Sequence, residues 1–379
     1  MRFSTKAIHI GQEPEKESGA VVPPVYLTTT YAQKSPGKFT HDYTRALNPS
    51  FDRLEPTLAA LENAKYAVVF SSGIGATTAI LSTLKSGDRV IATDDLYGGT
   101  YRLLEQGFKQ FGLRLGLINT QDINETVRAL KKKPQLFFIE SPTNPQLKIT
   151  DIRAVTRLSK KYNVRTVVDN TFASPYFQNP ITLGADVVLQ STSKYIAGHL
   201  DVIGGAVMTN ENDFYQQMIF ARKAYGLNPS PFDVWLTSRG VKTLALRMEK
   251  HQENAIAVAK FLENNSKVKK VYYPGLPRHQ GYSIARRQMR GFSGMVTVDF
   301  RLTLAETKKV ITSFKIFTLA ESLGGVRSLV DHPASMTHFM VPEKEQIKMG
   351  VTSSLVRISV GIEDKEDLIS DLKQALAKV

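Results

Sequence analysis

The sequence predicts an α/β protein with a large domain built on a mostly parallel sheet and a smaller α+β domain after it. Between about residue 47 and 240, short apolar runs alternate with helical patterns, and such alternation is typical of a parallel sheet covered by helices. After Arg239 the pattern changes to one long helix followed by separate strands. We therefore divide the chain into an arm (1–46), a large domain (47–243) and a small domain (244–379).

The arm is rich in Gly, Pro, Thr and Tyr. Val22-Pro-Pro-Val and Ser35-Pro-Gly interrupt any regular element there, because proline lacks the amide hydrogen that helices and central strands need. The arm therefore has little core of its own, and we expect it to be extended and to pack on something else.

The remaining elements follow from the spacing of apolar residues. Six runs predict the strands of the large domain: 67–70, 89–92, 136–139, 166–168, 187–189 and 204–208. Helical patterns between them include 53–64, 76–84, 100–111 and 152–162. In the small domain a helix at about 241–264 precedes strands at 295–300 and 355–360 and a final helix at 364–378.

Two of these strands lead to side chains of complementary chemistry. One run ends in the carboxylate of Asp169, and the next is followed by Ser191-Thr-Ser-Lys194. In an open α/β sheet, ligands bind beyond the carboxyl ends of the strands, so we expect this acid and this amine in one crevice. Pyridoxal phosphate (PLP) requires such a pair, a lysine for the Schiff base and an acid facing the pyridine nitrogen.

A glycine-rich turn, Ser71-Ser-Gly-Ile-Gly75, joins a predicted strand to a predicted helix. Such a turn presents free N–H groups and the positive end of the helix dipole to an anion. The dipole alone contributes only about 0.3–1 kcal/mol when exposed. A phosphate there would need a full positive charge as well, and Arg45 is the candidate.

A dinucleotide fold is the competing interpretation of this turn. Gly73 and Gly75 form G-x-G, and Asp94 lies where a ribose-binding acid would fall. The third small residue is missing, however, because position 78 is Thr. That interpretation also leaves Lys194 and Asp169 unexplained.

Two further residues each allow two interpretations. Tyr97, at a strand-to-helix turn, can stack on a planar ring ligand or be an ordinary loop tyrosine. Arg357 lies inside an apolar strand and needs a partner. A substrate carboxylate bound by both guanidinium nitrogens is one solution, and a structural ion pair is the other.

Composition narrows the class of protein. The formal charge is +14 over 379 residues, but basic residues are dispersed and interleaved with acids, which favours a solvated surface over a nucleic-acid interface. Cysteine is absent, which excludes disulfides, thiolate metal sites and a cysteine nucleophile; we predict no metal. Neither a signal peptide nor an apolar run of membrane-spanning length is evident, so we expect a cytoplasmic protein without membrane contact.

From about residue 5 to its C-terminus the chain resembles the Cys/Met-metabolism PLP enzymes, which include cystathionine γ-lyases, γ-synthases and β-lyases and methionine γ-lyases. The resemblance implies the aspartate-aminotransferase-like fold (fold type I) and bound PLP. It rests on these motifs: Tyr43-Thr-Arg45 with Asn48-Pro, Phe70-Ser-Ser-Gly, Asp95-Leu-Tyr-Gly-Gly, Glu140-Ser-Pro-Thr-Asn-Pro145, Val168-Asp-Asn-Thr171, Ser191-Thr-Ser-Lys-Tyr195 and Arg357-Ile-Ser-Val-Gly-Ile-Glu363.

The resemblance also implies a role for each matching residue. Lys194 would form the Schiff base and later carry protons, and Asp169 would keep the pyridine nitrogen protonated. Tyr97 would stack on the ring and assist proton transfer. The other cofactor-binding residues would be Gly73, Ile74, Ser191 and Ser193 at the phosphate, together with Thr171.

Asn144 and Arg357 would orient the phenolate side of the cofactor and the substrate carboxylate, and Ser322 would also contact the substrate. In this family the residues matching Tyr43 and Arg45 reach the phosphate of a neighbouring subunit's cofactor, and the Tyr43 position also meets substrate. The resemblance thus implies a homodimer with shared active sites, usually paired into a tetramer, acting on a small sulfur amino acid.

Glu321 best separates the family members. A glutamate at this position resembles the γ-lyases and γ-synthases, where it can pair with the far ammonium group of cystathionine. Typical methionine γ-lyases are apolar there and have a cysteine where this chain has Gly99. We favour a cystathionine γ-lyase, with γ-synthase and cystathionine or cystine β-lyase as alternatives.

Three departures from the family pattern bear on substrate preference. Leu47 stands where the family usually has glycine, Leu200 replaces a serine, and Arg327 replaces a glutamate. None removes a cofactor ligand, but each could alter the entrance to the site.

Overall fold

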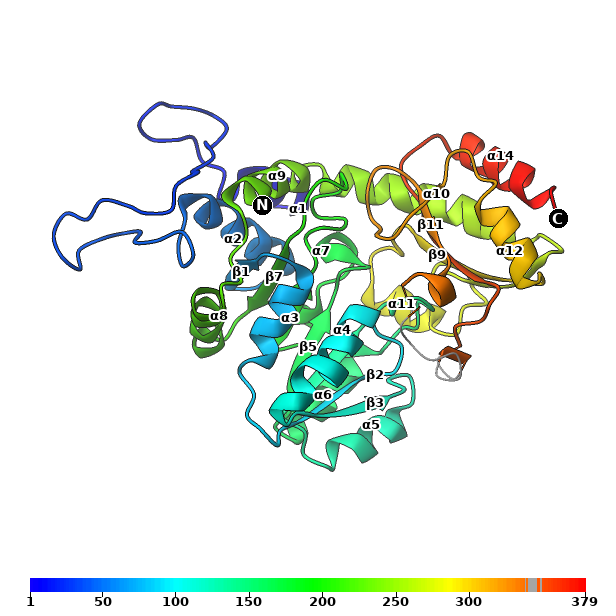
Figure 1. Cartoon of the computed structure of the whole chain (residues 1–379), viewed down its shortest axis with the longest axis horizontal. Coiled ribbons are helices and arrows are strands. Elements are labelled where there is room, and N and C mark those ends of the chain that lie inside the picture. The colour runs from blue at the N-terminus through cyan, green and yellow to red at the C-terminus, as the bar shows by residue number, and fades with distance from the viewer. Residues whose placement is uncertain (338, 340–345, 348–349) are drawn as a thin grey trace.

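The computed structural model describes residues 1–337, 339, 346–347 and 350–379 and confirms the predicted fold class (Figure 1). Within this part of the chain a seven-stranded sheet has the order β1-β7-β6-β5-β4-β2-β3. Only β7 runs antiparallel to its neighbours. The strands are β1 (Tyr66–Phe70), β2 (Arg89–Thr93), β3 (Arg114–Ile118), β4 (Leu136–Glu140), β5 (Arg165–Asp169), β6 (Val187–Gln190) and β7 (Gly205–Thr209).

Helices cover both faces of this sheet because its strands present apolar side chains on both faces. Val68 and Phe70 of β1 pack in the core that holds α3 and α8, whereas Ala67 and Val69 pack in the core that holds α2. The helices are α2 (Pro49–Glu62), α3 (Gly73–Leu81), α4 (Gly98–Arg102), α5 (Ile123–Leu130), α6 (Ile152–Lys161), α7 (Ser174–Phe177), α8 (Asn212–Tyr225) and α9 (Pro231–Val241). The remaining helical segments are a π-helix, η1 (Leu103–Phe108), and two 3₁₀ helices, η2 (Lys109–Phe111) and η3 (Pro180–Leu183).

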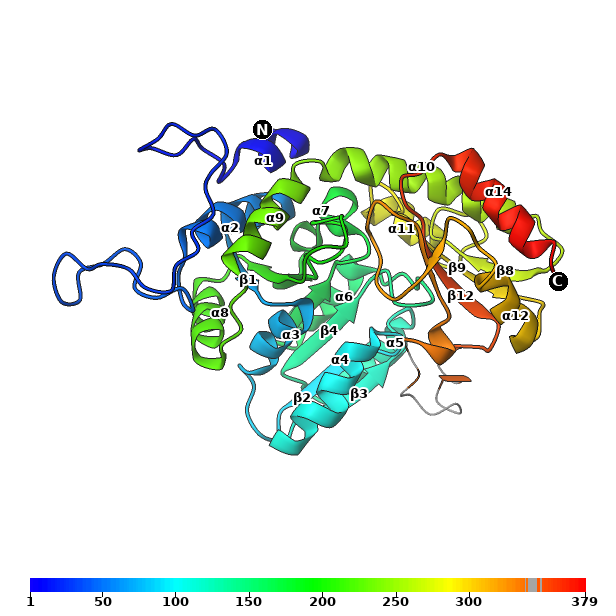
Figure 2. The same cartoon turned by 45° about the horizontal axis from the view of Figure 1, so that its top comes forward.

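A second sheet follows, with the order β10-β11-β12-β9-β8. Its apolar face packs with α10, α12 and α14 in a separate core, as Figure 2 shows at the C-terminal end of the molecule. The elements are α10 (Leu244–Glu263), β8 (Val268–Tyr272), α11 (Tyr282–Gln288), β9 (Met295–Phe300), α12 (Leu304–Ile311), β10 (Thr318–Leu319), β11 (Leu329–Asp331), η4 (Pro333–Ser335), β12 (Leu355–Ser359) and α14 (Lys365–Leu376).

The first part of the arm differs from the prediction. Residues Phe3–His9 form α1, a helix that buries Ala7 against α2 in the large core. From about residue 13 to 46 the chain has no helix and extends away from the body as two loops (Figures 1 and 2). Apolar side chains are exposed along it, including Val21 (77%) and Leu27 (71%).

Four strands were not predicted: β3, β8 and the two short strands β10 and β11. In β3 the burial pattern is irregular and two of its five residues are exposed, since it is the edge strand of its sheet. In β8 two adjacent residues, Lys269 and Lys270, are exposed. Both sequences therefore lack the apolar run that marks the central strands. Among the described helices, none is long and apolar enough to cross a membrane.

Candidate active site

A cavity of about 620 Å³ lies beyond the carboxyl ends of β4, β5 and β6. The N-terminus of α3 and the segment before β11 complete its walls. The structure brings twelve of the sequence-predicted site residues together there: Gly73, Ile74, Tyr97, Asn144, Asp169, Thr171, Ser191, Ser193, Lys194, Glu321, Ser322 and Arg357. Tyr43 and Arg45 do not line it.

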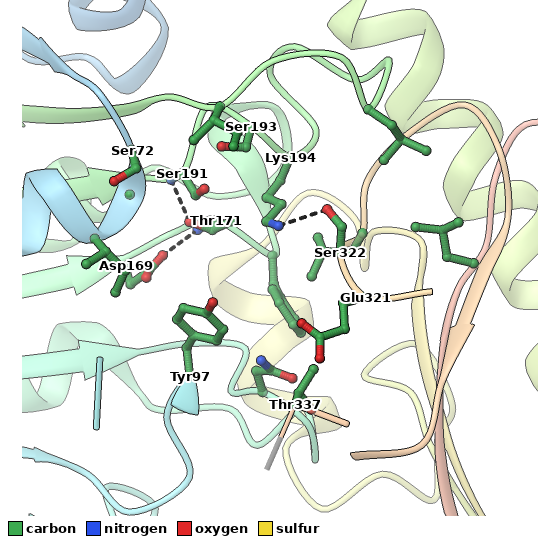
Figure 3. Close-up of a pocket in the computed structure, with 18 of the residues that line it drawn as sticks. Ser72, Tyr97, Asp169, Thr171, Ser191, Ser193, Lys194, Glu321, Ser322 and Thr337 are labelled. Atoms are coloured by element: carbon green, nitrogen blue, oxygen red, sulfur yellow. Dashed lines mark hydrogen bonds between the residues drawn. The ribbon is translucent and has the colours of Figure 1, made fainter. Parts of the chain in front are cut away.

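Asp169 and Lys194 occupy the positions that the strand pattern predicts. Asp169 is the last residue of β5, and Lys194 lies in the turn after β6. The Asp169 Oδ1 atom accepts a hydrogen bond of 3.0 Å from the Thr171 N–H. The Lys194 Nζ atom donates to Ser322 Oγ at 2.9 Å. Figure 3 shows both bonds, with Tyr97, Asp169 and Thr171 on one side of the pocket and Ser322 and Glu321 on the other.

The Lys194 amine is set up as a base and nucleophile. Its pKa is lowered to about 8, chiefly by burial and also by the nearby Arg357 charge, while Glu321 opposes the shift. A lysine amine must be neutral to attack a carbonyl or accept a proton. A lowered pKa therefore gives Lys194 a much larger neutral fraction near neutral pH than a solvated lysine has.

A second carboxyl group, which the sequence analysis assigned no role, lies beside Asp169. Glu140 ends β4 and is paired in register with Asp169 on β5. Burial and the Asp169 charge raise the pKa of Glu140 well above its usual value, and burial also raises the pKa of Asp169 against the opposing Thr171 hydrogen bonds. Glu140 Oε2 accepts from the Tyr97 N–H at 2.9 Å. Its buried Oε1 has no partner within the described chain. The position of an acid at the end of a strand identified Asp169, and the same signal could have identified Glu140.

The predicted phosphate cradle forms where α3 meets the turn after β6. Ser72 caps α3 by accepting a 2.9 Å hydrogen bond from the Gly75 N–H. A Cβ atom at Gly73 would lie 2.9 Å from Ser191 Cβ, so this close approach requires glycine. In the described part of the chain the Gly73 and Ile74 N–H groups have no acceptor, which leaves them available to an anion.

The two serines of the cradle are not equivalent. The Ser191 N–H donates to Thr171 Oγ1 at 2.9 Å, which joins the ends of β5 and β6. The Ser193 hydroxyl donates to the Gly204 carbonyl at 3.1 Å and accepts from the Gly204 N–H at 2.9 Å. Ser193 is therefore held by the backbone of the next loop, and the Ser191 hydroxyl is the more available of the two.

Arg357 forms a structural ion pair, which is one of the two interpretations that the sequence allowed, and it also lines the cavity. It is 3% exposed and pairs with Asp331, the residue opposite it across β11 and β12. Its Nη1 donates to Asn144 Oδ1 at 2.8 Å and its Nη2 to the Ser322 carbonyl at 3.2 Å. Asp331 was not singled out from the sequence. It fixes the guanidinium, so that a substrate carboxylate would meet a positioned cation.

Tyr97 presents its ring to the pocket from the start of α4 (Figure 3). A Cβ atom at Gly99 would lie 2.4 Å from Tyr97 Cε1. The ring therefore occupies space that only glycine leaves free at position 99. This geometry favours the stacking interpretation of Tyr97 over that of an ordinary loop tyrosine.

Tyr43 and Arg45 lie in the arm and are exposed. The Arg45 guanidinium lies 5.6 Å from the centroid of the Tyr43 ring. Neither residue contacts the cavity of its own chain. Their contact with the cofactor of a neighbouring subunit remains a prediction.

The residues of the cavity fit pyridoxal phosphate. Lys194 supplies a buried amine for covalent attachment, and Asp169 supplies an acid for the pyridine nitrogen. The α3 cradle supplies free N–H donors for a phosphate. The unpartnered Oε1 of Glu140 is a buried polar atom that a bound group could satisfy.

Comparison with known proteins identifies the family. The family model for "Cys/Met metabolism PLP-dependent enzyme" matches residues 4–377. The chain is 46% identical over 379 residues to a cystathionine gamma-lyase of Dictyostelium discoideum (100% of this chain, 98% of the relative). It is 46% identical over 377 residues to a cystathionine beta-lyase of Coxiella burnetii (99% and 97%).

A solved structure agrees over the whole length. The cystathionine gamma synthase of Xanthomonas oryzae pv. oryzae in complex with cystathionine matches with a TM-score of 0.98 at 42% identity, covering 100% of this chain and 98% of that one. Together with the cavity residues, these matches show that the chain belongs to the family of Cys/Met metabolism PLP-dependent enzymes and that its cofactor is pyridoxal phosphate.

Proposed function

We propose that this enzyme is a cystathionine γ-lyase, which converts L-cystathionine and water into cysteine, 2-oxobutyrate and ammonia. The observation that carries the proposal is Glu321. It lines the same cavity as Lys194 and is close enough to act on the pKa of that amine. It has no ion-pair partner in the described chain, so its carboxylate is available to a cationic group at the far end of a substrate.

Each side chain of the pocket has its own role in the reaction. PLP, when bound, supplies an electron sink that makes the substrate Cα–H acidic. The Lys194 amine, kept near Ser322 Oγ by a 2.9 Å hydrogen bond, accepts and returns the protons at Cα and Cβ. Arg357 binds the substrate α-carboxylate, with Asn144 and Asp331 holding the guanidinium in place. Asp169 would supply the acid that keeps the pyridine nitrogen protonated.

The cavity also has to exclude competing reactions. Phe172, Leu189, Val202 and Leu323 contribute apolar surface to its walls. Apolar walls of this kind strengthen the electrostatic interactions of Lys194, Asp169 and Arg357 with bound groups. They also fit the methylene and thioether segment of cystathionine.

β-Elimination and γ-replacement are the second candidates, since relatives of both kinds are similar over the whole chain. β-Elimination would yield pyruvate and homocysteine from the same substrate. γ-Replacement would join cysteine to an activated homoserine ester.

We also infer a homodimer with shared sites, paired into a tetramer, in the cytoplasm. The exposed apolar residues of the arm, among them Val21, Leu27 and Phe39, support this assembly, because such surface is normally covered by a partner. Arg45 would then supply the full positive charge that the α3 cradle lacks in its own chain.

The proposal is tested by comparing the rate of elimination with the rate of replacement. The PLP-loaded enzyme is given either cystathionine alone or cysteine with O-succinylhomoserine, and the products are separated by mass. We expect keto acid from cystathionine at a rate well above that of cystathionine synthesis. Faster synthesis than breakdown would assign the chain to the γ-synthases.

A further inference from the structure

Arg327 is held at a fixed place in the wall of the cavity. It lies between Gly325 and β11 and is one of the lining residues. The preceding Val326 donates its N–H to the Gly198 carbonyl at 2.9 Å. The following Ser328 donates its N–H and its hydroxyl to the Glu363 carboxylate at 2.6 and 2.8 Å. Val326 and Ser328 are therefore both held by hydrogen bonds, and these fix the backbone of Arg327 between them.

The side chain of Arg327 is exposed and has no hydrogen-bond or ion-pair partner among the described residues. Glu321, on the same loop, lines the same cavity and is likewise unpaired within that part of the chain. The two opposite charges do not neutralise each other by a direct ion pair. The loop thus offers an acceptor for a cation and a donor for an anion in one cavity.

Arg327 affects the pKa of the reactive amine less than Glu321 does. The charges that act on the pKa of Lys194 are those of Arg357 and Glu321, and Arg327 is not among them. Arg357 is buried beside Asn144 and Ser322, whereas Arg327 is exposed. The cavity therefore has two arginines in different environments, an inner one and one near its mouth.

Apolar residues line the cavity beside this outer arginine. Leu200, Val202 and Ile203 are all lining residues. Leu200 has a left-handed backbone (φ 62°), and its side chain fills the space over Gly325, where a Cβ atom would lie 2.4 Å from Leu200 Cγ. The cavity therefore has apolar wall surface that can accept an uncharged chain of methylene and sulfur atoms.

We propose that Arg327 binds the carboxylate at the far end of the substrate, next to the far ammonium group held by Glu321, so that the cavity selects substrates with an amino-acid group at both ends. This inference rests on the proposed function and names a residue that would discriminate between substrates with and without a carboxylate at the far end. Arg357 binds one carboxylate and Arg327 the other. A planar guanidinium is suited to a carboxylate because it can donate two parallel hydrogen bonds.

The test compares L-cystathionine with S-(2-aminoethyl)-L-homocysteine, which lacks only the far carboxylate, on the PLP-loaded enzyme. Arg327→Gln should lower kcat/KM for cystathionine about tenfold, chiefly through KM, and leave the truncated substrate within about twofold. Arg327→Lys should restore part of the loss. Arg278→Gln, which changes an exposed arginine outside the cavity, is the matched control and should leave both substrates unchanged.

Equal effects of Arg327→Gln on the two substrates, or no effect on either, would overturn the proposal. Binding is measured in parallel, as the dissociation constant from the change in cofactor absorbance. If wild-type enzyme releases no keto acid from cystathionine, the proposed reaction fails, but the binding assay still decides the role of Arg327. Wild-type preference for cystathionine over the truncated ligand, abolished by Arg327→Gln, supports it, and no such preference refutes it.

Discussion

The Lys194 amine donates a 2.9 Å hydrogen bond to the hydroxyl of Ser322, a residue 128 positions later in the chain. The carbonyl of the same serine accepts a hydrogen bond from Arg357 at 3.2 Å. Ser322 therefore contacts both the group that handles protons and the group that would hold the substrate carboxylate. The loop that carries Ser322 also carries Glu321, so the amine, the inner carboxylate site and the far end of the pocket are positioned together.

The lowered pKa of Lys194 predicts a pH-dependent stability of the cofactor-free protein. Its pKa is about 8 when folded against an ordinary 10.5, so between these values the unfolded state binds more protons and stability rises with pH. Below about pH 8 the cost of burying the charge is fully present, up to about 3 kcal/mol. Lys194→Met removes that cost.

The check is urea unfolding of both cofactor-free proteins from pH 7 to 10. Lys194→Met should be the more stable at pH 7, and the difference should shrink as the pH rises toward 10. A difference that stays constant with pH would show that Lys194 is not buried as a charged amine. Lys160→Met, at an exposed site on α6, is the control and should show no such trend.

Asp169→Asn should disable the reaction while leaving the fold intact. The asparagine can still accept the Thr171 hydrogen bond, but it cannot stabilise a protonated pyridine nitrogen. We expect kcat to fall by at least about a hundredfold, with a small change in Tm. Circular dichroism and steady-state kinetics measure the two effects. Near-normal kcat in the variant would remove Asp169 from its assigned role.

Arg45→Ala should weaken retention of PLP. Arg45 is exposed and does not line the cavity of its own chain, so any effect on the cofactor must come through a neighbouring subunit. We expect the dissociation constant for PLP to rise about tenfold or more, measured by fluorescence after dialysis. Lys38→Ala, another exposed cation of the arm, should leave it unchanged. Unaltered PLP affinity in Arg45→Ala would argue against shared active sites.

Gly99→Ala should displace the Tyr97 ring. The added Cβ atom would lie 2.4 Å from Tyr97 Cε1, so the ring must turn away from the pocket. We expect a loss of activity comparable to that of Tyr97→Phe or larger, and a shifted cofactor absorbance, because stacking on the ring is disturbed. Gly87→Ala is a useful comparison, since open space surrounds that position although its φ is +90°. Full activity in Gly99→Ala would contradict the assigned ring position.

The central strands could be predicted from the sequence because they are buried on both faces. Every residue of β4 and β7 is buried, so each appears as an apolar run. The edge strand β3 and the lysine-bearing strand β8 carry exposed residues, and their identity depends on pairing with a neighbour. Helix α1 was missed because its short apolar face becomes evident only where Ala7 meets α2.

The same distinction applies to the site. Lys194, Asp169 and the α3 turn could be located because each lies at or shortly after the end of a recognisable strand. The partners of these groups could not, since they depend on contacts across the fold. The pairing of Arg357 with Asp331 requires the register of β11 and β12, and the proximity of Glu140 to Asp169 requires that of β4 and β5. Nor could the sequence show that the Ser193 hydroxyl bonds to Gly204 whereas the Ser191 hydroxyl has no partner among the described residues.

The most direct test of the proposed function is to give the purified, PLP-loaded enzyme L-cystathionine and to identify the keto acid released. We predict 2-oxobutyrate together with cysteine, which is the outcome of γ-elimination. Pyruvate together with homocysteine would contradict it and would make the enzyme a β-lyase.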